Sequence, residues 1–147
     1  MLVLPTGQVL WSDSETPSPY KEIAVYTPQG KPKASWLPVV SGVSSMLTVG
    51  STGNPISGKN FNGFSLGGSY GALTQAATNY PLVRFTNAST GDVCYARSYG
   101  FSTMGVFTKG TTNAQFDIPK SCETGASTLQ VVVNGIASAG TSVTLSD

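Results

Sequence analysis

The chain contains no histidine, which removes the side chain most often used for catalysis and metal binding. Without an imidazole it cannot form a Ser-His-Asp triad or a Cys-His pair. Imidazole-based zinc and copper sites are excluded, and two cysteines are too few for a thiolate zinc site. The sequence therefore predicts no metal and no other cofactor, and it leaves carboxylate chemistry as the one enzymatic route.

Charged residues are also scarce. They make up 10% of the chain, against about 25% in typical soluble domains. The net charge is +1 and the basic residues are scattered, so we expect no nucleic-acid partner. A surface rich in Ser, Thr and Gly in place of charge is common on secreted β-proteins, which favours an extracellular or periplasmic location.

Long apolar runs and helix signals are missing as well. The apolar stretches, such as Val131 to Val133, are far shorter than the roughly 18 residues of a membrane helix, so no membrane span is predicted. The N-terminal stretch has no basic region and is interrupted by Pro5, which predicts no signal peptide. Only residues 71–78 (GALTQAAT) suggest a helical turn.

Short β-rich runs separated by Gly, Pro, Asn and Ser fill most of the chain, which is the pattern of an all-β protein. We expect a division near Pro38, with a short β-rich segment and linker at 1–37 and an antiparallel immunoglobulin-like β-sandwich at 38–147. The expected strands lie at 2–4, 8–12, 22–27, 39–43, 46–49, 82–87, 92–97, 105–108, 114–118, 129–134 and 141–145.

Several motifs resemble a known family. The opening LVLPTGQVLW, followed by EIAVYTPQG, resembles part of the last blade of a kelch-type β-propeller. From Trp36 onward the chain resembles the early-set immunoglobulin-like domain that follows the propeller in galactose oxidase-like proteins. The matching motifs are TNYPLVR at 78–84, FDIP at 116–119 and VVNGIAS at 132–138. The resemblance implies a fragment or a stand-alone descendant of a larger propeller protein.

The chemistry of that family does not follow from the resemblance. In its copper-radical oxidases the sandwich domain supplies a histidine ligand, from a loop that corresponds to ARSYGFS at 96–102. Histidines would be expected near Tyr99 and Phe101, and this chain has none. The radical-forming tyrosine–cysteine pair would lie in the propeller. The resemblance therefore implies the domain without its oxidase activity.

Aromatic residues in expected loops favour a non-catalytic interaction module that binds a polysaccharide or a protein partner. Exposed rings stack on the apolar faces of sugars, while amides take the hydroxyl groups. The candidate ligand-binding residues are Tyr99, Phe101, Tyr70 and Asn62. The alternative is that the rings fill the open ends of the sandwich as core residues, or pack against a propeller.

Two other functions stay open. A glycoside hydrolase would need two carboxylates about 5–9 Å apart, and the candidates are Asp92, Asp117 and Glu123. Cys94 and Cys122 either form one disulfide or remain two separate buried thiols. Asp92 and Glu123 could come together if the cysteines are bridged; the alternative is that Asp92 sits in a Gly-Asp turn and Glu123 in a solvated loop. A structural subunit would instead form a homo-oligomer through the open strand edges of the N-terminal segment.

Overall fold

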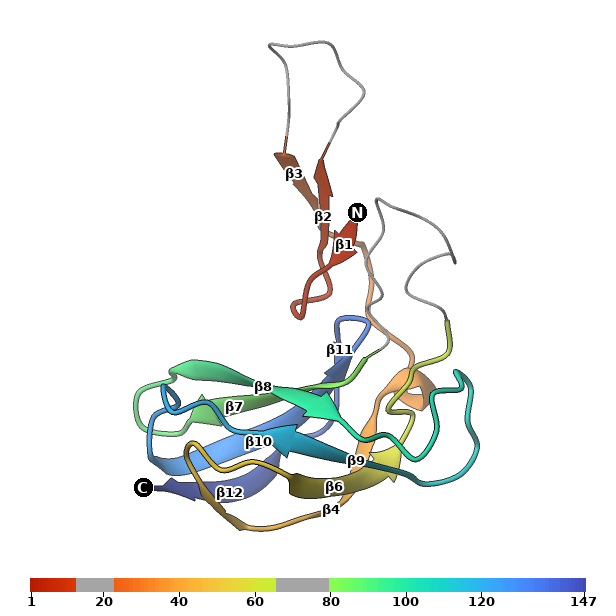
Figure 1. The fold of residues 1–147 in the computed structure, drawn as a ribbon. Coiled ribbons are helices and arrows are strands. Elements are labelled where there is room, and N and C mark those ends of the chain that lie inside the picture. Colours follow the sequence, from red (N-terminus) through yellow and green to blue (C-terminus); the bar gives the residue numbers. More distant parts are fainter. Residues whose placement is uncertain (13–22, 66–79) are drawn as a thin grey trace.

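The computed structural model describes residues 1–12, 23–65 and 80–147 (Figure 1). In these ranges the regular elements are strands, apart from one short 3-10 helix, η1 (Ala34–Trp36). The helical turn expected at 71–78 lies outside the described residues. The prediction of an all-β sandwich is confirmed, because the strands after η1 form one long sheet that curls into two facing layers.

The strand order of this curled sheet is that of an immunoglobulin sandwich. The first layer consists of β4 (Val39–Val43), β6 (Asn54–Lys59), β9 (Thr112–Asp117) and β8 (Val93–Tyr99). The second consists of β7 (Leu82–Asn87), β10 (Gly125–Val133), β12 (Thr141–Ser146) and β5 (Met46–Thr48), with β11 (Ile136–Ala137) paired to β10. If the strands are lettered in order of appearance, the first layer is A-B-E-D and the second is C-F-G. Strand β5 continues strand A on the second layer.

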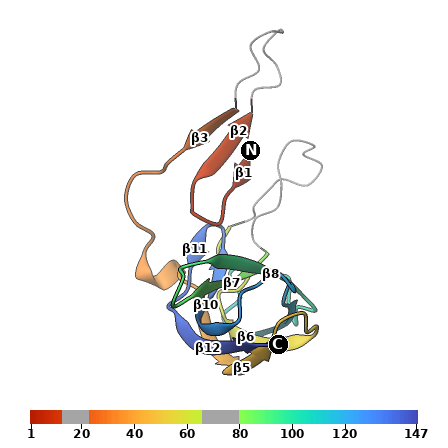
Figure 2. The same cartoon turned by 90° about the vertical axis from the view of Figure 1, so that its left-hand side faces the viewer.

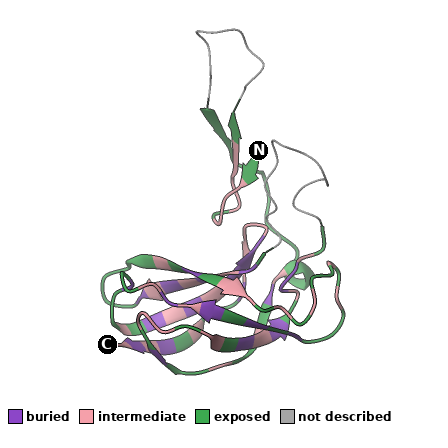
Figure 3. Cartoon of the chain, in the orientation of Figure 1, coloured by how far each residue is buried: buried purple, intermediate pink, exposed green. Residues whose placement is uncertain are grey.

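The core lies between the two layers, where every second residue of a strand points inward. β7 alternates half-buried and buried positions along its whole length, and β9 alternates buried and more exposed positions. Figure 3 shows the buried positions alternating with more exposed ones along the strands of the sandwich. Phe85, Phe116 and Leu129 are at most 1% exposed, and the two phenylalanine rings lie 6.1 Å apart. Removing either ring would cost about 3–5 kcal/mol, because a well-packed core does not collapse into the cavity.

A disulfide fastens one end of the sandwich. It joins Cys94 in β8 to Cys122 in the loop before β10, with Cα atoms 5.4 Å apart and a sequence separation of 28. Of the two arrangements that the sequence left open, the chain therefore has the bridged one. In the chain-entropy treatment, closing a loop of this length stabilises the fold by roughly 3–4 kcal/mol.

The sequence pattern misplaced two segments. Residues 105–108, expected as a strand, form a turn in the loop between β8 and β9. Strand β6 was not expected, because Pro55 and Gly58 discourage a central strand. Gly58 is nevertheless required there, since a Cβ atom at this position would collide with the Val39 carbonyl oxygen and the Phe61 ring.

Residues 1–12 and 23–26 form a separate three-stranded sheet that projects from the sandwich (Figures 1 and 2). Its strands are β1 (Leu2–Val3), β2 (Val9–Ser12) and β3 (Ile23–Tyr26), all antiparallel. The turn between β1 and β2 touches the turn between β10 and β11, and a Cβ atom at Gly135 would collide with the backbone of Gly7. The faces of the small sheet stay largely exposed.

The close approach at Gly58 leads to a stability prediction. We expect Gly58→Ala to lower the free energy of unfolding by roughly 3 kcal/mol, because the added methyl group pushes β4 and the Phe61 ring apart. Gly110→Ala is the matched control, since nothing lies within 4 Å of its Cβ position. Urea unfolding of both variants measures the difference, and equal stability would show that β4 does not pack on β6 in this way.

Candidate functional site

An open pocket of ≈ 350 Å³ lies where β7 begins and β8 ends. The antiparallel register places Leu82 opposite Arg97, so the chain entering β7 and the chain leaving β8 meet at this corner. The pocket is lined by Tyr80, Pro81, Leu82, Arg97, Ser98, Tyr99, Gly100 and Phe101. It therefore contains both of the aromatic residues that the sequence singled out at 99 and 101.

Two aromatic rings define the apolar part of this pocket. The rings of Tyr80 and Phe101 lie 5.9 Å apart with 52° between their planes. Phe101 also packs against the core, so its ring is fixed on one side, whereas Tyr80 is 48% exposed. The tilted pair offers an apolar surface that the sandwich holds in place on the Phe101 side. Phe101 thus serves both the core and the pocket, two roles that the sequence analysis treated as alternatives.

Tyr99 is held by hydrogen bonds rather than left free. Its hydroxyl donates to Oδ1 of Asp117 at 2.8 Å, and the backbone N–H of Gly53 donates to the same oxygen at 2.9 Å. The bond to the Asp117 carboxylate raises the pKa of Tyr99 above its ordinary value, with smaller contributions from burial and from the negative charge. Tyr99 is therefore a fixed wall of the pocket.

Asn62 does not take part in this pocket. It is 4% exposed, and its Nδ2 donates to the carbonyl oxygens of Thr103 at 2.7 Å and Gly105 at 3.3 Å. The Asn62 amide is thus largely removed from solvent, and its donors hold the loop after β8. Tyr70, the fourth expected binding residue, lies outside the described residues.

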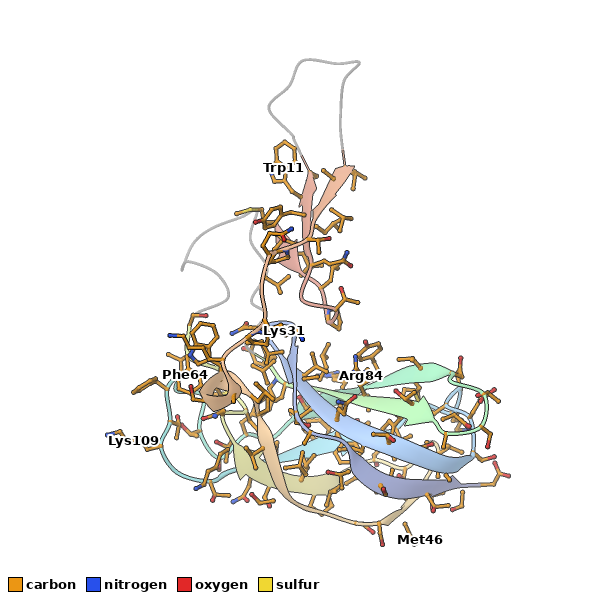
Figure 4. All side chains as sticks on the ribbon, turned by 180° about the vertical axis from the view of Figure 1, so that it is seen from behind. Trp11, Lys31, Met46, Phe64, Arg84 and Lys109 are labelled. Carbon is orange, nitrogen blue, oxygen red and sulfur yellow. A yellow bond between two sulfur atoms is a disulfide. The ribbon has the colours of Figure 1, made fainter. Side chains whose placement is uncertain are left out.

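A second aromatic pair lies on the loops that Asn62 joins. The rings of Phe64 and Phe107 are 5.1 Å apart at 72° (Phe64 is labelled in Figure 4), and Phe107 is 62% exposed. The backbone N–H of Phe107 donates to the carbonyl oxygen of Gly63 at 2.9 Å. Neither ring lines the pocket at Tyr80. This pair serves as an internal control for any experiment on exposed aromatic residues.

Among the described residues, the candidate carboxylates Asp92 and Glu123 share only a shallow depression. This depression lies beside the disulfide and has no room for even a water-sized molecule. Glu123 accepts a hydrogen bond from the Thr90 hydroxyl at 2.5 Å. Asp117 lies opposite Arg97 in the β8–β9 register. Arg97 is five residues along β8 from Asp92, so the backbones of Asp117 and Asp92 are roughly 17 Å apart along the strand. Asp92 and Glu123 are exposed at the surface, but the depression that they share has no room for a sugar.

Within the described ranges, no group of three or more His, Cys, Asp or Glu side chains is arranged to hold a metal ion. The same part of the chain has no helix of the length and apolarity that crossing a bilayer requires. No protein-family model matches the chain, and no curated protein is significantly similar to it. The geometry of the pocket is therefore the basis for inferring function.

The hydrogen bond between Tyr99 and Asp117 leads to a pH-dependent prediction. Because the folded-state pKa of Tyr99 is raised, the bond contributes its full stability below the ordinary pKa near 10 and loses it as the pH rises through the folded-state value. Tyr99→Phe should therefore be less stable than the wild type at pH 7, and the difference should shrink above about pH 10.

Urea unfolding at a series of pH values measures this difference. Tyr95→Phe is the control, because the Tyr95 hydroxyl makes no hydrogen bond with a described residue. A stability difference for Tyr99→Phe that stays constant from pH 7 to the alkaline range would show that the hydroxyl does not bind a carboxylate.

Proposed function

We propose that this chain is a non-catalytic interaction module that binds a carbohydrate in the pocket at Tyr80, Arg97 and Phe101. The observation that carries the proposal is the partly exposed pair of rings, which stands beside an arginine in an open pocket. The volume of ≈ 350 Å³ lies near the lower end of the roughly 300–1,000 Å³ typical of small-molecule sites, which suits a short stretch of saccharide.

The two kinds of surface in the pocket match the two kinds of surface on a sugar. The apolar face of a pyranose ring stacks on an aromatic ring, and Tyr80 is the ring with the larger exposed area. The sugar hydroxyls then face the Tyr80 hydroxyl and the Arg97 guanidinium, which supply donors. Because Phe101 and Tyr99 are fixed by the core and by Asp117, little conformational entropy is lost on binding.

The wider biological setting follows as part of the same proposal. The motifs at 78–84, 116–119 and 132–138 support, within this proposal, an early-set sandwich similar to that of galactose oxidase-like proteins but without the histidine copper ligand, with β1–β3 resembling part of a kelch blade. The disulfide between Cys94 and Cys122 supports an oxidising compartment, and hence an extracellular or periplasmic location.

A glycan array with the wild type and Tyr80→Ala tests the proposal. We expect saturable binding by the wild type and a loss of roughly tenfold in affinity for Tyr80→Ala, because the variant removes the exposed stacking surface. Phe107→Ala is the matched control, since it deletes an exposed ring that does not line the pocket. Both variants should unfold at the temperature of the wild type, because neither ring is buried.

Two outcomes would contradict the proposal. Absence of binding to every glycan on the array would exclude a carbohydrate-binding role. Binding that is lost in Phe107→Ala but kept in Tyr80→Ala would transfer the site to the Phe64–Phe107 pair.

A second function, self-assembly, is favoured by the small β1–β3 sheet. Both of its faces are apolar and open: Ile23 and Val25 on one face are 77% and 52% exposed, and Trp11 and Tyr26 on the other are 41% and 62% exposed. The outer edge of β3 pairs with no described strand. Such an edge normally carries charged residues or proline as protection, and the four residues of β3, Ile23–Tyr26, include neither.

We propose a second copy of this chain as the occupant of the β3 edge. Any strand edge can pair antiparallel with itself across a two-fold axis, and the uncharged strands of this sheet bring no like charges together. Light scattering should then give twice the 15.2 kDa mass of the chain, and Val25→Lys should restore the mass of a single chain. Val93→Lys, at a valine 47% exposed on the sandwich, should leave the dimer intact. A wild type that stays monomeric up to millimolar concentration would exclude this assembly.

A further inference from the structure

Two arginines stand side by side on the outer face of the β7–β8 pair, at the edge of the pocket. Residues directly opposite each other on paired strands share a face, and the register sets Leu82 opposite Arg97 and Arg84 opposite Tyr95. Arg84 and Arg97 are therefore diagonal neighbours on that face, roughly 7–8 Å apart at the backbone. Figure 4 shows Arg84 on the sandwich, away from Lys109 and Phe64.

Neither guanidinium group is neutralised by a carboxylate in the described part of the chain. Arg97 makes no hydrogen bond or ion pair with another described residue. Arg84 donates from one amino group to Oε1 of Gln130 at 2.5 Å, and its Nε has no partner. Two adjacent cations repel each other, so this arrangement is one that a bound anion would stabilise.

Among the described residues, the acid opposite Arg97 is Asp117, and one of its oxygens is engaged. Asp117 faces Arg97 across the β8–β9 pairing, but its Oδ1 accepts from both the Tyr99 hydroxyl and the Gly53 N–H. No carboxylate oxygen of Asp117 comes within ion-pair distance of Arg97. The fork of donors on Arg97 is thus left open toward the pocket that it lines.

We infer that the ligand of this pocket is an acidic saccharide, whose anionic group binds Arg97 while its sugar ring stacks on Tyr80. This inference rests on the proposed carbohydrate-binding function and narrows it to one chemical class. A planar guanidinium binds a carboxylate or a sulfate ester through two parallel hydrogen bonds, and these charge-assisted bonds are stronger than those to a neutral hydroxyl. In a polymer with repeated acidic units, a second unit is within reach of Arg84.

The shared chemistry is an anionic group on a sugar, and it can come from a uronic acid or from a sulfate ester. An array that pairs each acidic glycan with its neutral counterpart distinguishes the two sources. Uronic acid polymers are printed beside their methyl esters, and sulfated glycans beside their desulfated forms. Preference for one pair identifies which anion the pocket takes.

We expect the wild type to bind the acidic member of a pair at least about tenfold more tightly than the neutral one. Arg97→Gln should remove that preference while leaving weak binding through Tyr80. Arg97→Lys should restore part of it, because an ammonium keeps the charge but loses the bidentate geometry. Lys109→Gln, which removes the same charge outside the pocket, should bind like the wild type. Affinity for the acidic glycan should fall as salt is raised.

Each other outcome is decisive. Equal binding of acidic and neutral members, lost in Tyr80→Ala, would overturn the inference and leave the proposed function standing. An unchanged preference in Arg97→Gln would likewise overturn it. Absence of binding to any glycan would overturn both. Equal losses in Arg97→Gln and Lys109→Gln would indicate a non-specific charge effect and would also overturn the inference.

Discussion

The packing of Phe85 against Phe116 across the two layers is the constraint on which the pocket depends. Because Phe85 and its neighbour Val83 must point inward, Leu82 and Arg84 must point outward on the same strand. The antiparallel register with β8 then sends Arg97 and Tyr99 to that outer face as well. The aromatic and cationic character of the pocket is therefore a consequence of which residues the core takes.

The two ends of the β7–β8 pair are held by different means and differ in the room that they offer a ligand. At one end the disulfide ties β8 to the loop before β10, and the depression beside Asp92 and Glu123 has no room for a ligand. At the other end the chain approaches through Tyr80 and leaves through Phe101, and the pocket stays open. A rigid scaffold with fixed rings is suited to recognition, since preorganised groups lose little conformational entropy on binding.

The sequence predicted those features that depend on local pattern. The alternation in 82–87 and 141–145 reproduces β7 and β12 to within a residue, because one face of each strand is buried and the other is not. Strand β6 was missed because Gly58 is chosen for a close approach to Val39 and Phe61, a contact that exists only in the folded chain. The turn at 105–108 was mistaken for a strand because its apolar residues face solvent rather than a core.

The candidate site was predicted only in part, for a related reason. Tyr99 and Phe101 were recognised because they flank a glycine in an expected loop. Tyr80 and Arg97 were missed, since they belong to the site only through the pairing of β7 with β8, and register depends on contacts that are distant in sequence. For Asn62 the loop position gave no sign that the amide is buried and holds a second loop.

The most direct test of the account is the location of the ligand on the folded protein. Two-dimensional NMR of the isotopically labelled chain, titrated with the acidic glycan that binds best, reports this residue by residue. The account predicts that the shifted backbone signals cluster at 80–82 and 97–101, on the two segments that line the pocket. Shifts confined to the Phe64–Phe107 loops, or to the turn at Gly135 beside the small sheet, would contradict it.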